Sequence, residues 1–119
     1  MEFFICKHCG NIITHIYESG VPELCCGEIM QELVAGIDGA PEKHIPQVKI
    51  ENNIVTVYMS HPMTADNYIQ WIAIETTNGN QIIELSCDDE PKAEFALING
   101  AEFIAAHEYC NLHGLWTSK

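Results

Sequence analysis

The sequence contains no arginine, and its five lysines face seventeen aspartates and glutamates, so the formal net charge is −12 at pH 7. A nucleic-acid-binding surface must be basic to neutralise phosphates, and anionic lipid likewise attracts basic segments. This charge balance therefore argues against nucleic acid and membrane as partners.

Long apolar runs are also missing. No uninterrupted apolar stretch approaches the roughly 18 residues that suggest a membrane span. The first residues, 1 to 6, carry no basic segment ahead of an apolar core, so we expect no secretion signal and a cytoplasmic protein. In a reducing compartment, clustered cysteines favour metal or redox chemistry over disulfides.

Cysteine and histidine are abundant, with six of each in 119 residues. Four of the cysteines lie within residues 1–36, and the glycines and proline between Gly36 and Pro41 predict a linker. We therefore expect a small metal-binding subdomain over 1–36 and a second domain over 37–119. A segment as short as the first usually needs a metal or disulfides to fold.

The second region is predicted to be β-rich. Short runs suited to strands cover 47–50, 54–59, 68–76, 81–86, 93–98 and 102–109. The asparagines and glycine between the first and second runs and between the third and fourth predict hairpin turns. No convincing helical period is present. The spacing therefore favours an antiparallel sandwich or barrel.

The first group of candidate metal ligands is Cys6, Cys9, Cys25 and Cys26. Four thiolates suit a tetrahedral site for zinc or iron, and the spacing alone leaves both metals open. Adjacent residues in a strand point to opposite faces, so Cys25 and Cys26 can share a metal only if the backbone bends there, which Gly27 would ease. We expect His8 and His15 to be exposed or to lie behind the ligands.

A second group gathers near turns and strand ends. Cys110 and His113 lie three residues apart in a predicted turn, so one loop can offer a thiolate and an imidazole to a single metal. His44 precedes the first long strand, His61 follows the second, and a proline lies near each. His107 should face away from Cys110 and is expected at the surface.

Several segments of the sequence resemble those of a known family. The run CKHCGNIITHIYESGVPELCCGE resembles the desulforedoxin-like domain of desulfoferrodoxin, the two-iron type of superoxide reductase. The segments EKHIP, HPM with YIQWI, and EYCNLHGLW resemble its catalytic domain in order and spacing. The resemblance implies a mainly β protein: a four-cysteine domain holding iron (or zinc), followed by an immunoglobulin-like, seven-stranded antiparallel β-sandwich with a second iron. It also implies a homodimer.

The family's catalytic iron has four histidines in a plane and an axial cysteine. His44, His61 and His113 match three of those histidines, and Cys110 matches the thiolate. Where the family has its fourth histidine, this chain has Asn67. An asparagine can offer a carbonyl oxygen or leave the place to water.

The function implied by the resemblance is reduction of superoxide to hydrogen peroxide, with electrons from a small donor such as rubredoxin. Lys43 would attract the anion and position a proton-donating water, and Glu42 would afterwards occupy the open position of the ferric iron. The alternative is a non-catalytic iron-binding or electron-transfer protein whose second site is degenerate.

Overall fold

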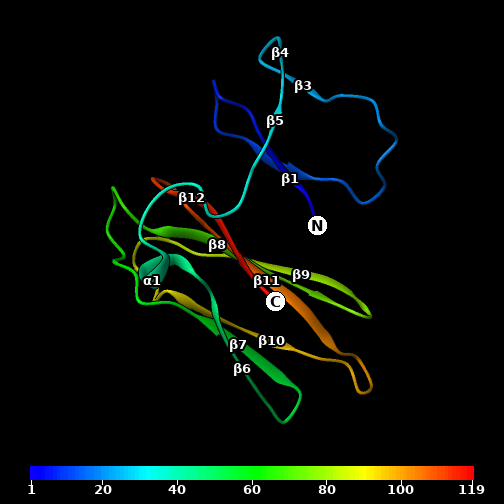
Figure 1. Cartoon of the computed structure of the whole chain (residues 1–119), viewed down its shortest axis with the longest axis vertical. Helices are drawn as coiled ribbons and strands as arrows, with labels where there is room; N and C mark the ends of the chain where they lie inside the picture. Colours follow the sequence, from blue (N-terminus) through cyan, green and yellow to red (C-terminus); the bar gives the residue numbers. More distant parts are fainter. The chain divides into compact units, whose positions relative to one another are not determined.

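The computed structural model describes residues 1–119 and divides into two compact units, Met1–Val34 and Ala35–Lys119 (Figure 1). No helix in the structure has the length and apolar character needed to cross a membrane.

The first unit is built from very short strands. Strand β1 (Phe3–Ile5) pairs with β2 (Ile12–Thr14) on one side and with β5 (Gln31–Glu32) on the other, and β3 (Leu24–Cys25) forms a separate hairpin with β4 (Glu28–Ile29). Phe3, Cys6 and Met30 are its buried apolar residues. Because so few side chains are buried, apolar packing alone gives this unit little stability.

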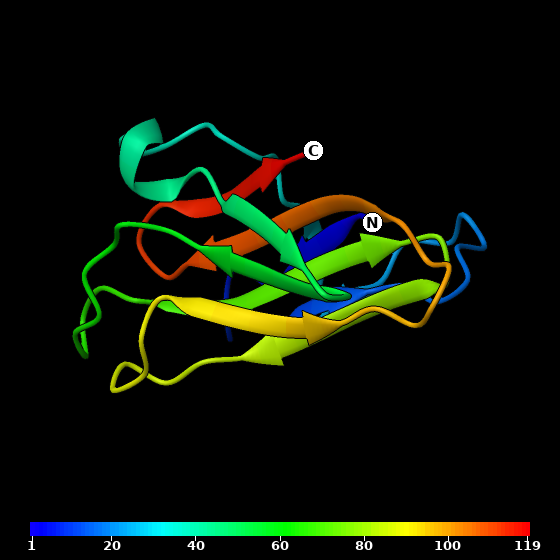
Figure 2. The ribbon, with the colours of Figure 1, turned by 90° about the horizontal axis from the view of Figure 1, so that it is seen from below.

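The second unit is a seven-stranded antiparallel sandwich, which confirms the predicted fold class. One sheet has the order β10–β7–β6 and the other β12–β11–β8–β9. The two layers are visible in Figure 1, and Figure 2 shows the three-stranded sheet nearly face-on. The strands are β6 (Gln47–Glu51), β7 (Ile54–Tyr58), β8 (Ile69–Thr76), β9 (Gly79–Glu84), β10 (Lys92–Ala96), β11 (Phe103–Cys110) and β12 (Gly114–Ser118).

Alternating side chains from the two sheets form the core. Val55 and Val57 of β7 face Ile72 and Ile74 of β8, and all four are fully buried together with Phe95 of β10. Their spacing of two residues follows from the pleat, which turns every second side chain to the same face. This core fixes the strand ends from which the second site is built.

The predicted hairpin between the first two strands of this unit is confirmed. Glu51 pairs with Ile54 around Asn52 and Asn53, whose φ angles are +51° and +62°. Two consecutive residues at positive φ form the tight turn that matches the twist of paired strands, and asparagine tolerates this conformation well.

Two elements of the second unit were not predicted from its residue pattern. Helix α1 (Pro41–His44) is a single turn that begins at a proline, and β12 follows the turn at 111–113 to pair with β11. A one-turn helix leaves no periodic pattern in the sequence. Figure 2 shows α1, the loop after β7 and the β11–β12 turn gathered at one end of the sandwich.

The expectation that His107 lies at the surface is wrong. This side chain is buried, and its ring contacts Glu75 of β8 and Thr117 of β12. Because β11 is an inner strand, both of its neighbours supply polar partners to a histidine on the face opposite the core. Burial lowers the pKa of His107, and Glu75 partly opposes that effect.

Candidate metal centres

The four cysteines of the first unit lie together. The sulfur atoms of Cys6, Cys9, Cys25 and Cys26 are all within 4.8 Å of one another, and Cys9 Sγ lies 3.6 Å from Cys25 Sγ. Tetrahedral metal–sulfur bonds of about 2.3 Å place their sulfurs roughly 3.8 Å apart. The cluster therefore has the dimensions of a tetrahedral thiolate site.

A tight turn brings the adjacent pair onto one side. Cys25 pairs with Glu28 across the β3–β4 hairpin, and the two turn residues, Cys26 and Gly27, have φ angles of +53° and +80°. The backbone thus bends where the sequence requires it, although Cys26 itself shares the left-handed conformation with Gly27. The bend lets both thiols reach the same point.

The crowded thiols influence one another's ionisation. The backbone N–H of Cys9 lowers the pKa of Cys6 to about 6, whereas the side chains of Cys6 and Cys9 raise the pKa of Cys25 to about 12. Without a metal, the cluster therefore holds protons between its sulfurs, and a bound cation would displace them.

The histidines of this unit stay outside the cluster. His8 lies 3.1 Å from Glu28, and His15 lies 2.9 Å from Glu18. His8 is exposed and His15 is partly buried against Phe4.

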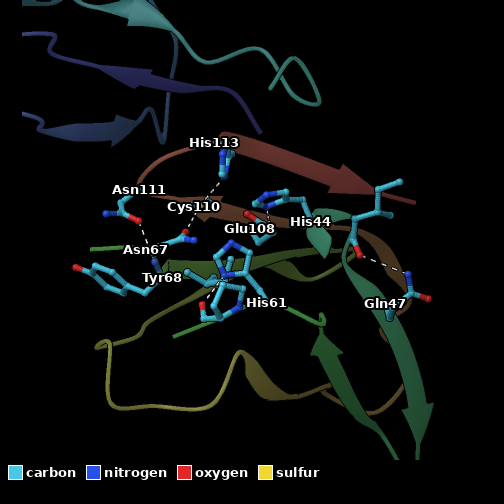
Figure 3. Close-up of polar contacts among 12 residues, drawn as sticks. His44, Gln47, His61, Asn67, Tyr68, Glu108, Cys110, Asn111 and His113 are labelled. Atoms are coloured by element: carbon cyan, nitrogen blue, oxygen red, sulfur yellow. Dashed lines mark hydrogen bonds and ion pairs between the residues drawn. The ribbon is translucent and has the colours of Figure 1, made fainter. Parts of the chain in front are cut away.

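The second group is at one end of the sandwich. His44 ends α1, His61 lies in the loop after β7, Cys110 ends β11 and His113 lies in the following turn. Their ligand atoms lie within 4.8 Å of one another, and Figure 3 shows the rings turned toward a common point. Three imidazoles and one thiolate form a donor set that suits iron or zinc.

His44 is the most enclosed of the three histidines. Its ring stacks on Trp116 at 5.3 Å between centroids and lies 4.7 Å from the ring of His61 and 5.0 Å from that of His113. Burial lowers the pKa of His44 to about 4, with smaller contributions from the neighbouring histidines. The ring is therefore neutral near pH 7, as a metal ligand must be.

His61 is oriented by its own backbone. Its Nδ1–H donates to the carbonyl oxygen of Pro62 at 2.6 Å, which leaves Nε2 without a proton. Burial also lowers the pKa of His61. The free Nε2 is the atom that can bind a metal.

Cys110 is fully buried at the end of β11. Burial raises the pKa of its thiol, and the backbone N–H groups of Leu112 and His113 donate to its sulfur and partly offset that effect. His113 Nδ1 lies 3.8 Å from this sulfur. The turn after β11 therefore supplies the ligand His113, and two of its backbone N–H groups donate hydrogen bonds to the sulfur of the ligand Cys110.

Asn67 lies at the edge of this group. Its Oδ1 is 3.5 Å from Cys110 Sγ, and its side chain points toward the sulfur in Figure 3. Glu42 and Lys43, by contrast, are exposed on α1. Lys43 nevertheless contributes to lowering the pKa of both His44 and His61, so its ammonium acts electrostatically on the group.

Three residues of this region were missed in the sequence. Glu108 is completely buried, and its Oε2 lies 3.5 Å from His44 Nδ1. Gly39 packs against the rings of two ligands. Asn111 forms hydrogen bonds with the loop that carries Asn67. A charged residue in an otherwise apolar strand was the available signal for Glu108. Nothing local distinguishes Gly39 from the other glycines.

Comparison with known proteins decides the family. The desulfoferrodoxin family model matches residues 37–119. The chain belongs to the desulfoferrodoxin family. Desulfoferrodoxin of Syntrophotalea carbinolica is 37% identical over 100% of this chain and 96% of its own, and that of Nitratidesulfovibrio vulgaris is 36% identical over 99% and 95%.

A solved structure agrees with the family assignment. The superoxide reductase of Treponema pallidum superposes with a TM-score of 0.85 at 34% identity, covering 99% of this chain and 96% of its own. The resemblance of the sequence to desulfoferrodoxin is therefore confirmed along nearly its full length.

Proposed function

We propose that this chain is a superoxide reductase, which reduces superoxide to hydrogen peroxide at an iron held by His44, His61, His113 and Cys110. The observation that carries the proposal is the convergence of three imidazoles and one thiolate within 4.8 Å in a member of the desulfoferrodoxin family. Relatives in Treponema pallidum and Pyrococcus horikoshii bear the name superoxide reductase.

The residues fit an iron on two observations. His61 is held as the tautomer with a free Nε2, and His44 Nδ1 has no hydrogen-bond partner, with Glu108 Oε2 3.5 Å away as the nearby acceptor that could orient the ring. Imidazole nitrogens and a thiolate are the donors that select iron over harder cations. When bound, iron would supply the single electron that superoxide accepts.

Charged side chains of this chain would attract the superoxide anion and help to protonate it. Reduction of superoxide consumes one electron and two protons and gives one hydrogen peroxide. A protein of charge −12 repels this anion overall, so a local cation must attract it. Lys43 is that cation, because it is exposed next to His44 and its charge lowers the pKa of both His44 and His61. It would also hold the water that delivers a proton.

Glu42 is the second catalytic candidate. It lies in the first turn of α1, exposed, two residues before His44. Its carboxylate would serve as the group that exchanges with product at the open side of the site. The electron consumed in each turnover would come from a small donor protein such as rubredoxin.

Asn67 replaces the family's fourth histidine in this proposal. Its position next to Cys110 supports a site with three imidazoles, in which water or the asparagine amide would stand where the family has its fourth imidazole. The site would therefore hold iron less firmly than a four-histidine site. If the loss of this ligand abolished chemistry, the protein would be a non-catalytic metalloprotein instead.

We propose that residues 1–36 are a desulforedoxin-like four-cysteine domain holding iron, or zinc, and that 37–119 are the catalytic domain. The sulfur spacing of Cys6, Cys9, Cys25 and Cys26 supports the first assignment. We also propose a cytoplasmic location, because a cluster of thiols that binds a metal suits a reducing compartment.

A homodimer is also proposed. The first unit exposes a group of large apolar side chains that a monomer would leave in water: Ile16, Tyr17, Val21, Leu24 and Ile29. Exposed apolar groups of this kind are typical of interaction surfaces. A second copy of the chain is the proposed occupant.

Metal analysis with a visible spectrum tests the function. Protein purified from iron-replete cells should contain iron at the second site and show a thiolate-to-ferric absorption that disappears in Cys110→Ser but persists in Cys26→Ser. Cys26→Ser should remove the separate absorption of the first site if iron is bound there. A colourless protein containing only zinc would contradict the proposed function.

A further inference from the structure

The side chain of Asn67 is held against the sulfur of Cys110. Its Oδ1 lies 3.5 Å from Cys110 Sγ, where the thiol can donate its proton to the amide oxygen. The amide nitrogen of Asn67 forms no hydrogen bond within the chain. One end of this amide is therefore engaged by sulfur and the other is free.

The loop that carries Asn67 is fixed from two sides. Within the loop, the backbones of Thr64 and Asn67 bond to each other in both directions, and the Thr64 hydroxyl accepts from the Asn67 N–H. From the other side, Asn111 accepts from the Tyr68 N–H at 2.9 Å and donates to the Asp66 carbonyl at 3.0 Å. The residue after Cys110 thus clamps both neighbours of Asn67.

This clamp sets the position of the side chain but leaves its amide free to rotate. The oxygen and nitrogen of an asparagine exchange places by a half-turn about the Cβ–Cγ bond, and the local hydrogen bonds decide which end faces a partner. A thiol can donate to the oxygen, whereas a metal-bound thiolate has no proton and can only accept. With a metal on Cys110, the favoured orientation presents Nδ2–H to the sulfur.

We propose that Asn67 serves as a hydrogen-bond donor to the Cys110 thiolate rather than as a replacement metal ligand. This inference rests on the proposed function, because it requires a metal on Cys110. An amide oxygen is a weak, hard ligand, and water competes with it for the same place. A thiolate in a buried site, by contrast, gains from every N–H aimed at it.

The consequence is a sulfur with three donors. The backbone N–H groups of Leu112 and His113 already point at Cys110, and Asn67 adds a third. Hydrogen bonds to a ligand sulfur withdraw electron density from the bond to the metal and stabilise the reduced state. Asn67 is therefore a positioning and tuning residue that acts through Cys110.

The test uses the iron-loaded full chain with Asn67→Leu, which keeps the size of the side chain and removes its donor. We expect the thiolate-to-ferric absorption to move to longer wavelength, the reduction potential to become more negative, and iron retention against a chelator to stay as in wild type. The matched control is Asn99→Leu, the same change at an exposed asparagine in the β10–β11 loop, which should leave all three unchanged.

Asn67→Asp supplies a second, independent reading. The aspartate has the same shape and no N–H, so its absorption should shift in the same direction as in Asn67→Leu. An unshifted absorption in Asn67→Leu overturns the inference and leaves the proposed function standing. Weaker iron retention in Asn67→Leu with stronger retention in Asn67→Asp also overturns it, since that pattern identifies an oxygen ligand. If the absorption that persists in Cys26→Ser is not removed by Cys110→Ser, both the inference and the proposed function are overturned.

Discussion

His44 Nδ1 lies 3.5 Å from Glu108 Oε2, and both side chains are almost wholly buried. The other ring nitrogen of His44 is the one that faces the second site, next to Gly39 and the ring of His113. A metal-bound histidine usually donates its remaining N–H to a carboxylate or carbonyl, which fixes the ring and strengthens it as a ligand. Glu108 occupies the place of that acceptor.

Removing this carboxyl should therefore weaken metal binding. We expect Glu108→Ala to lose iron at chelator concentrations roughly 10- to 100-fold lower than wild type, because His44 would lose its acceptor. Competition with a chelator, followed by the absorption of the second site, measures the change. Glu94→Ala on β10, where the side chain is exposed, is the control and should retain iron normally. Equal retention in Glu108→Ala would mean that the carboxyl does not support His44.

The same carboxyl predicts a pH dependence of the metal-free protein. Burial raises the pKa of Glu108 to about 9 from an ordinary value of 4.5, so the folded state holds a proton that the unfolded state releases. Stability should fall as pH rises through this window, by at most about 1.4 kcal/mol per pH unit. The pKa of His44 is lowered from 6.5 to about 4, so its titration makes stability rise with pH, but only below about pH 6.5.

Urea unfolding of metal-free wild type and Glu108→Gln between about pH 7 and pH 9 isolates the Glu108 contribution, because both proteins share the titration of the thiols. The free energy of unfolding of wild type should decline over this range more steeply than that of Glu108→Gln, which has no titrating group there. Parallel curves for the two proteins would show that Glu108 is ionised in the fold.

Gly39 is predicted to be essential to the second site for a steric reason. It has a φ of +93°, and a Cβ at this position would lie 2.9 Å from both His113 Cγ and His44 Nε2. Gly39→Ala should displace these rings and release iron at lower chelator concentration. Gly100→Ala is a matched control, since Gly100 has a φ of +91° and open space around it. If both variants lose stability but keep iron equally well, the close approach of Gly39 is unimportant.

Asn67→His should strengthen metal binding. An imidazole at this place supplies the nitrogen ligand that the family usually has, so the variant should hold iron at chelator concentrations that strip the wild type. Iron content after dialysis against a series of chelator concentrations measures this. Identical stripping curves would show that residue 67 cannot reach the metal.

The sequence predicts much of this molecule because its signals are local. The run of β-branched residues in Ile54–Tyr58 and the turn at Asn52–Asn53 define strands and a hairpin without reference to the rest of the chain. The spacing of Cys110 and His113 likewise marks a turn that can hold a metal, and the structure brings both beside His44 and His61.

The residues that sequence reasoning missed act across long separations. Glu108 matters because β11 lies beside α1, and Gly39 matters because the chain before α1 passes over two ligand rings. His107 was misplaced for the same reason, since its burial depends on Glu75 and Thr117 in neighbouring strands. Period and spacing carry no information about which strands become neighbours.

The most direct test of the central claim is the reaction of reduced, iron-loaded protein with superoxide. Pulse radiolysis generates the superoxide and monitors the reaction, and the hydrogen peroxide and oxygen that form are both quantified. We predict rapid oxidation of the iron with one hydrogen peroxide formed per superoxide consumed and no oxygen released. Lys43→Ala should slow this reaction, and rising ionic strength should shrink the difference, whereas Lys49→Ala, an exposed lysine on β6, should react as wild type. A reduced protein whose iron superoxide does not oxidise would contradict the account.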